Sequence, residues 1–302
     1  MTIIGEALAK WGVTRLADFL FKLIGKACGN KPVPNWEATI ERLVPDIRIY
    51  GLVPEEPRLE LLGPYRATNE QRKAADLLRP TLDENDPHAM LVEEPELIHS
   101  PVHLRANTLD YALLEVLRNE KKHQHIVSAG ALVVCQKART LVLHHRSKDS
   151  RTFDGCIHIT GGAYWPPNVI PRKDRDALSL KATARREVME ETGAAIDCDG
   201  SAPMLLAQER SERFFQFVLL GSNISPTQLR SLKENWEGKG IIKVGYDELR
   251  AYLVSPPKPW VPSGKGHVLA WLALGAPGGG WMPRFGKLTP QELFLDIVSL
   301  SA

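Results

Sequence analysis

Three glutamates lie close together on one predicted helix in the second half of the chain. Residues 181–192 contain neither proline nor glycine, which predicts a helix that ends at Gly193. Glu187 precedes Glu190 by three residues and Glu191 by four, so the three carboxylates share one side of the helix. Like charges at this spacing repel, and a hard divalent cation such as Mg²⁺ would reverse that repulsion. The plainer interpretation is a solvated acidic helix face.

The residues around this cluster resemble a known motif. Arg186-Glu187-Val188-Met189-Glu190-Glu191-Thr192-Gly193-Ala194 is similar to the second half of the Nudix box, G-x5-E-x7-R-E-U-x-E-E-x-G-U, where U is a bulky aliphatic residue. Every fixed residue of that half is matched, and only Ala194 is smaller than usual. The resemblance covers residues 126–273, roughly half of the chain. It implies a Nudix-type α/β/α sandwich and the Mg²⁺- or Mn²⁺-dependent hydrolysis of a diphosphate linked to another moiety.

The first half of the box departs from the family pattern. Counting back from Arg186 places the family glutamate at Leu178 and the family glycine at Arg172, so neither residue is matched. If Gly162 is the true box glycine, the loop up to the arginine is ten residues longer than the standard one. The missing glutamate usually pairs with the box arginine, and Asp174 or Asp176 could take its place.

The resemblance assigns roles to the acidic cluster. Glu187, Glu190 and Glu191 would be the metal ligands and catalytic residues, and the backbone carbonyl of Gly162 would be a further ligand. Metal ions neutralise the charge of a pyrophosphate, hold its oxygens and lower the pKa of the attacking water.

Basic and aromatic side chains next to the box are candidates for substrate binding. Arg146, Lys148 and Arg151 precede it and could hold phosphate oxygens by charge-assisted hydrogen bonds. Tyr164 and Trp165 could stack on a base or a sugar. The plainer interpretations are solvated basic residues and a packed or exposed loop.

Two further pairs of residues are candidates for parts of the site. Glu234 and Glu237 lie before a predicted strand, in a region where Nudix enzymes often place an extra acid, so either could be the general base. His144 and His145 alternate across a predicted strand, so at most one faces the site, and surface histidines are the favoured interpretation.

The elements expected to position these residues follow the order in which Nudix domains enter their box. Residues 126–135 and 141–146 read as a hairpin of β-branched and apolar strands, and residues 157–160 as a strand that leads into Gly161 and Gly162. Residues 211–221 and 241–244 read as further strands, and residues 246–253, 267–274 and 290–300 as helices.

The predicted organisation has two parts. Residues 1–122 form a mainly helical N-terminal region of unknown role, and residues 123–302 form the Nudix-like domain with C-terminal helices. Apolar stripes in residues 3–24 would pack on their own domain, with a homodimer seam or a membrane surface as alternatives. A short helix is expected at residues 36–44, another at 70–78 capped by Asn69, and a third at 107–119.

Composition excludes several classes of protein. With 38 basic and 36 acidic residues the net charge is +2, so no global field favours nucleic acid or membranes, and RNA decapping lacks support. Cys28, Cys135, Cys156 and Cys198 form no C-x-x-C pair and read as reduced thiols. A secretory signal and an apolar run of about 18 residues are both missing, which predicts a cytoplasmic protein.

The sequence therefore predicts a metal-dependent pyrophosphohydrolase of the Nudix type. Its partner would be a small-molecule diphosphate, most simply a nucleoside diphosphate derivative. The alternatives are a non-catalytic nucleotide-binding or sensing Nudix module and, less favoured, a prenyl diphosphate isomerase-like activity.

Overall fold

The computed structural model describes most of the chain after its first thirty-one residues. The described ranges are 32–82, 86–95, 101–122, 125–146, 153–166, 178–197, 202–233, 238–278 and 283–301. The apolar stripes predicted for residues 3–24 lie outside these ranges, so their expected packing on their own domain and the alternative dimer seam stay predictions.

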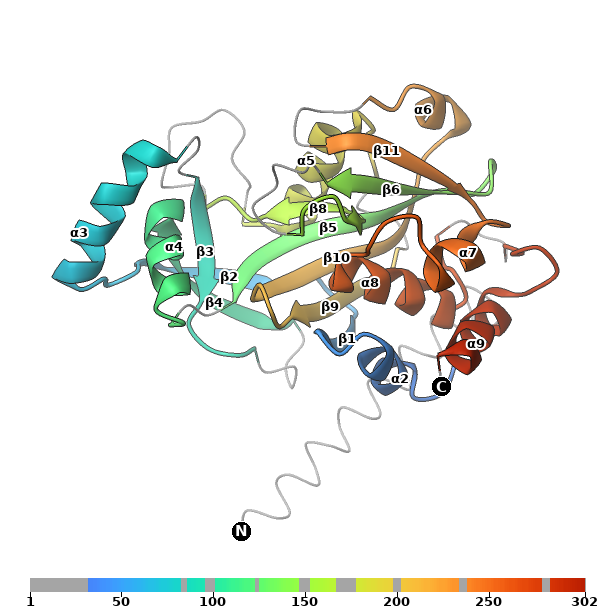
Figure 1. Cartoon of the computed structure of the whole chain (residues 1–302), viewed down its shortest axis with the longest axis horizontal. Coiled ribbons are helices and arrows are strands. Elements are labelled where there is room, and N and C mark those ends of the chain that lie inside the picture. The colour runs from blue at the N-terminus through green and yellow to red at the C-terminus, as the bar shows by residue number, and fades with distance from the viewer. Residues whose placement is uncertain are drawn as a thin grey trace, which may run out of the picture.

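One mixed sheet organises the described part of the molecule (Figure 1). The sheet has eleven strands in the described residues, and seven of them run in the order β1-β9-β10-β5-β3-β4-β2. Of the other four, β6 and β8 pair with β5, and β7 and β11 pair with β6. The strands are β1 (Ile47–Val53), β2 (Arg58–Pro64), β3 (Pro87–Leu91), β4 (His103–Asp110), β5 (Ile126–Cys135), β6 (Thr140–Arg146), β7 (Ile157–His158), β8 (Thr160–Ala163), β9 (Met204–Glu209), β10 (Phe214–Asn223) and β11 (Gly238–Gly245). The predicted α/β fold with a central sheet is confirmed.

Strand β5 is the centre of this sheet because all ten of its residues are buried. Such a continuous apolar run suits a strand that is covered on both faces. It pairs in parallel with β10 and antiparallel with β3, β6 and β8. The register sets Ala129 opposite Gly162 and Gly130 opposite Gly161, so the glycine pair lies beside the central strand.

Helices cover the two faces of the sheet and form two apolar cores. On one face, Val127, Ala129, Ala131 and Val133 pack with α5. On the other, Leu132 and Val134 pack with α2, α8 and α9. The helices are α2 (Trp36–Leu43), α3 (Asn69–Leu78), α4 (Tyr111–Asn119), α5 (Leu180–Thr192), α6 (Pro226–Arg230), α7 (Leu249–Val254), α8 (Pro262–Ala273) and α9 (Pro290–Leu300), with a 3₁₀ turn η1 (Arg79–Thr81).

The N-terminal region differs from the mainly helical one expected. Between residues 32 and 122 the strands β1 to β4 accompany the helices α2, α3 and α4. Strand β1 pairs with β9 and β3 pairs with β5, so the sheet continues across the predicted division at residue 122. The predicted helix at residues 107–119 divides into the end of β4 and α4, and Thr68 rather than Asn69 caps α3.

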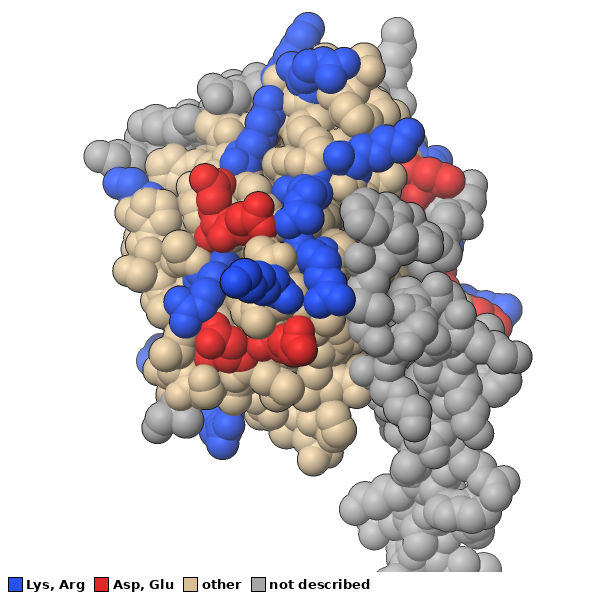
Figure 2. Space-filling model, turned by 90° about the vertical axis from the view of Figure 1, so that its right-hand side faces the viewer, with Lys and Arg blue, Asp and Glu red and all other residues tan. Residues whose placement is uncertain are grey.

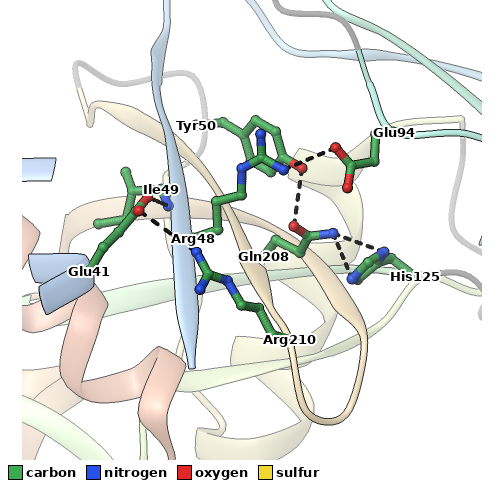
Figure 3. Close-up of polar contacts among 8 residues, drawn as sticks. All are labelled: Glu41, Arg48, Ile49, Tyr50, Glu94, His125, Gln208 and Arg210. Carbon is green, nitrogen blue, oxygen red and sulfur yellow. Dashed lines mark hydrogen bonds and ion pairs between the residues drawn. The ribbon is translucent and has the colours of Figure 1, made fainter. Parts of the chain in front are cut away.

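Polar contacts hold β1 to the rest of the sheet (Figure 3). The hydroxyl of Tyr50 donates to Oε1 of Gln208 at 3.1 Å, and Nε2 of Gln208 lies 2.6 Å from Nε2 of His125. Arg48 pairs with Glu94 at 3.0 Å. These contacts join a segment near the N-terminus to β9, about 160 residues later in the chain.

Charges of both signs lie next to one another on the surface. Figure 2 shows lysine and arginine side chains interleaved with aspartate and glutamate over the face that it views. This agrees with the near-balanced composition, which gives a net charge of +2. Within the described ranges, none of the helices has both the length and the apolar character that crossing a bilayer requires.

Candidate active site

Helix α5 presents the acidic cluster, and both of its ends are fixed. Ser179 caps the first turn, and a carboxylate oxygen of Glu56 accepts hydrogen bonds from the Ser179 hydroxyl at 2.8 Å and the Lys181 N–H at 2.9 Å. A negative charge at this position is favoured by the helix dipole. Gly193 ends the helix in the left-handed conformation with φ 70°, which glycine adopts more readily than other residues.

The three glutamates of the box line one cavity of about 580 Å³. Glu187 and Glu191 are 7% and 6% exposed, while the side chain of Glu190 is 41% exposed. The Gly161 N–H donates to Glu191 at 3.1 Å. A Cβ atom on Gly162 would lie 2.5 Å from both carboxylate oxygens of Glu187, so only glycine lets that carboxylate approach so closely. The glycine pair and the acidic cluster therefore form one site.

Arg186 connects the cluster to the strand beside it. Its guanidinium donates to Glu190 at 2.8 Å and to the Ala163 carbonyl at 3.0 Å, and it lies 2.9 Å from Glu187. Its Cζ lies 4.1 Å from the centroid of the Trp165 ring, a cation–π distance. The box arginine thus finds its anionic partners within the box itself.

The residue at the position of the missing box glutamate makes none of these contacts with Arg186. Leu178, which stands there, is 58% exposed. Asp174 and Asp176, the substitutes considered for it, lie outside the described residues. Glu56, from the connection between β1 and β2, instead brings a carboxylate to the start of α5. No local pattern indicates this role, because Glu56 precedes the helix by more than 120 residues.

The carboxylates suit a divalent cation by their chemistry. Oxygen donors on a buried, acidic wall are what Mg²⁺ and Mn²⁺ prefer, and Glu187, Glu190 and Glu191 share one cavity with Gly162. Among the described side chains, no group of three or more His, Cys, Asp or Glu residues has already converged as a metal site. In this conformation Arg186 contacts two of the three carboxylates, so a cation would compete with it for them.

The predicted substrate-binding residues have different outcomes. Arg146 and Trp165 both line the cavity. Lys148 and Arg151 lie outside the described residues, so their roles stay predictions. Tyr164 is fully buried in the core under α5, which excludes it as a stacking platform in a loop.

His144 corrects another expectation. It is buried rather than on the surface, and its Nδ1 lies 3.8 Å from a carboxylate oxygen of Glu191. Burial, followed by the charge of Arg146, lowers the pKa of His144 to about 4, so the ring is neutral at pH 7. Glu234 and Glu237, the candidates for the general base, lie outside the described residues.

A second group of polar residues lies in the cavity, and the sequence did not point to it. The Ser263 hydroxyl donates to Glu209 at 2.5 Å, and the Gln216 amide donates to the same hydroxyl oxygen at 3.3 Å. Nε2 of His158 lies 3.4 Å from that oxygen. Glu209, Gln216, His158 and His267 all line the cavity and are buried. These residues come from four separate elements, so no local motif could reveal them.

Burial shifts the ionisation of this group. It raises the pKa of Glu209 to about 7, although the hydrogen bond from Ser263 acts in the opposite direction. It lowers the pKa of His267 to about 3 and that of His158 well below its usual value. Both histidines are therefore neutral at pH 7.

A third part of the cavity is built by the N-terminal region. His88 on β3 and Tyr111 on α4 make an edge-to-face contact, with ring centroids 5.6 Å apart. The guanidinium of Arg118 lies 5.9 Å from the Tyr111 ring and 6.0 Å from the ring of Phe214. All four side chains line the same cavity as the box glutamates. The region before residue 122 is therefore part of the site.

Solved structures of Nudix proteins resemble parts of this chain. The MutT protein from Methanosarcina mazei Go1 is 20% identical, with 48% of this chain and 91% of that protein covered and a TM-score of 0.35. The Nudix domain of NrtR from Shewanella oneidensis, solved with ADP ribose, is 14% identical, with 50% and 90% covered and a TM-score of 0.34. A bifunctional NMN adenylyltransferase/ADP ribose pyrophosphatase from Francisella tularensis, solved with AMP and a Mn ion, is 11% identical, with 54% and 49% covered and a TM-score of 0.35.

No model of a protein family and no curated protein matches the chain.

Proposed function

We propose that this chain is a Nudix-type hydrolase that cleaves the pyrophosphate bond of a small molecule, most simply a nucleoside diphosphate derivative, with Mg²⁺ or Mn²⁺. The observation that carries the proposal is the meeting of Glu187, Glu190 and Glu191 with Gly162 at the wall of one cavity. A cavity of about 580 Å³ lies within the range of about 300–1,000 Å³ for sites that enclose small molecules.

The carboxylates of the box would hold the cation. When bound, the cation would neutralise phosphate charge and lower the pKa of the attacking water. Glu187 and Glu191 are held in place by their contacts with Arg186 and Gly161, and Glu190 is the most exposed of the three. Glu190 is therefore the member best placed to meet an incoming ion.

Arg186 and Arg146 would serve the phosphates. Both line the cavity, and a guanidinium released from Glu187 and Glu190 by a cation could turn its donors to phosphate oxygens. Trp165 would hold the plane of Arg186 through its stacked ring.

The test is a screen for metal-dependent hydrolysis with the full chain. The panel contains nucleotide sugars, dinucleotides, ADP-ribose and nucleoside triphosphates, each with Mg²⁺, with Mn²⁺ and with a chelator. Glu190→Gln is expected to lower the rate by about 10²–10⁴-fold, as the loss of a metal-held charge does. Glu55→Gln, which changes an exposed glutamate that does not line the cavity, serves as the matched control. Equal activity of Glu190→Gln and the wild type would remove the assignment.

The pairing of Arg186 with two box carboxylates also favours a second candidate, a Nudix module that binds a nucleotide without hydrolysing it. In that case the arginine would keep the carboxylates neutralised and no cation would replace it. Tight nucleotide binding without turnover across the whole panel, with either metal, would select this alternative over hydrolysis.

A further inference from the structure

Three buried polar side chains that line the cavity have no role in the proposed hydrolysis. Glu209, Gln216 and His267 are 1%, 8% and 0% exposed, and all three line the cavity. Within the described part of the chain, Oε1 of Glu209, Oε1 of Gln216 and both ring nitrogens of His267 have no hydrogen-bond partner. Buried polar atoms are nearly always paired in folded proteins, so three such side chains around one cavity indicate a polar ligand.

Ser263 fixes the direction in which these atoms face. A hydroxyl has one donor and two acceptor lone pairs. In Ser263 the donor goes to Oε2 of Glu209, and the oxygen accepts from Nε2 of Gln216 with Nε2 of His158 also within reach. The Ser263 hydroxyl therefore has no further hydrogen bond to offer. It leaves the second carboxylate oxygen of Glu209 and the amide oxygen of Gln216 for another molecule.

Rigid elements carry the group. Glu209 lies directly opposite Phe214 in the β9–β10 ladder, and Gln216 follows two residues later, so their side chains share one face of the sheet. Ser263 and His267 are four residues apart on α8 and so share one side of that helix. The positions of the unpartnered atoms are thus set by the sheet and a buried helix.

The chemistry of the group selects what it would bind. Two acceptor oxygens, one of them on a carboxylate, repel a phosphate and attract hydrogen-bond donors. The neutral ring of His267 adds one donor and one acceptor. A hydroxyl-bearing sugar or an amino-bearing base fits these requirements, whereas a prenyl chain does not.

We propose that Glu209 and Gln216 bind the part of the substrate that carries no phosphate, through hydroxyl or amino donors on a sugar or a base. This rests on the proposed function, in which the diphosphate lies at the box glutamates, which line the same cavity. Arg146 also lines this cavity.

The test measures binding without turnover, by isothermal titration calorimetry of the full chain in the presence of a metal chelator. The probes are ADP-ribose, its inosine counterpart, which lacks the amino group of the base, and ADP, which lacks the second sugar. At pH 8, where Glu209 is ionised, Glu209→Gln replaces an acceptor by an amide donor and is expected to weaken ADP-ribose binding by about 10- to 100-fold, the value of a hydrogen bond to a charged group. Gln216→Leu should weaken it by about 5- to 10-fold.

Gln208→Leu is the matched control. Gln208 is a buried glutamine on β9 that contacts Tyr50 and His125 (Figure 3). It does not line the cavity. Its loss should leave the affinity unchanged, and circular dichroism of each variant reports folding.

The probes also identify the donor. If the inosine probe binds more weakly than ADP-ribose, the hydrogen-bond donor is on the base. If ADP binds more weakly than ADP-ribose, the donor is on the second sugar. Equal affinities of the wild type and Glu209→Gln for ADP-ribose would overturn the proposal, as would the absence of binding by all three probes. Binding that depends on Glu209 without hydrolysis in any metal would retain this inference while removing the proposed hydrolase activity.

Discussion

Replacing Glu209 by glutamine is expected to stabilise the fold at alkaline pH. The carboxyl group is buried, and burial raises its pKa from 4.5 to about 7 against the opposing hydrogen bond from Ser263. Asp46 and Glu212 act in the same direction as burial, and Arg146 acts against it. Glutamine keeps the shape of the side chain and removes the ionisation.

The sign follows from proton linkage. The unfolded chain releases the proton of Glu209 near pH 4.5, whereas the folded chain keeps it until about pH 7. Between these values the unfolded state binds fewer protons, so the free energy of unfolding of the wild type falls as the pH rises. The rise of the pKa of Glu209 from 4.5 to about 7 corresponds to roughly 3 kcal/mol, by which the ionised carboxylate lowers the free energy of unfolding above pH 7.

Urea unfolding of the wild type and Glu209→Gln at pH 5 and pH 8 measures this difference. The variant should exceed the wild type by less than about 1 kcal/mol at pH 5 and by roughly 3 kcal/mol at pH 8. Glu55→Gln, at an exposed position, should follow the wild type at both pH values. A variant that is less stable at pH 8, or that shows the same pH dependence as the wild type, would refute the reasoning. Higher stability together with weaker ligand binding is typical of a binding-site residue.

Three further changes test the site. Gly162→Ala places a Cβ 2.5 Å from the carboxylate oxygens of Glu187. Because that carboxylate can rotate away, the free energy of unfolding should change by less than about 1 kcal/mol, whereas kcat should fall by about 10²-fold. A normal kcat would contradict the placement of Glu187. Glu56→Gln removes a charge from the start of α5 and should lower stability by about 0.5–1 kcal/mol in urea unfolding, and an unchanged midpoint would dismiss the capping role. Trp165→Ala removes the ring over Arg186 and should destabilise the fold by about 0.5–1 kcal/mol and raise KM, as thermal unfolding and steady-state kinetics will report.

The sequence predicted the elements whose signals are local. The helix expected at residues 181–192 is α5 (Leu180–Thr192), ended by Gly193, and the strand expected at residues 126–135 is β5 (Ile126–Cys135). A run without helix breakers and a run of β-branched residues each specify their structure without help from distant segments. The acidic cluster followed from helical spacing in the same way.

The remaining features depend on contacts between distant segments. Strand β1 has an alternating pattern only in Ile47, Arg48 and Ile49, and its pairing with β9 decides its structure. Glu209 and Ser263 are 54 residues apart and meet because α8 packs on the sheet. No periodicity or motif in either segment specifies that meeting, which is why this group of polar residues could not be predicted.

Isothermal titration calorimetry of the full chain with Mn²⁺ tests whether the box glutamates hold a divalent cation. The wild type and Glu55→Gln should bind Mn²⁺ with the same affinity, and Glu190→Gln should bind it at least about tenfold more weakly, because one charged ligand is lost. Mn²⁺ affinity that is the same in Glu190→Gln as in the wild type would contradict the account.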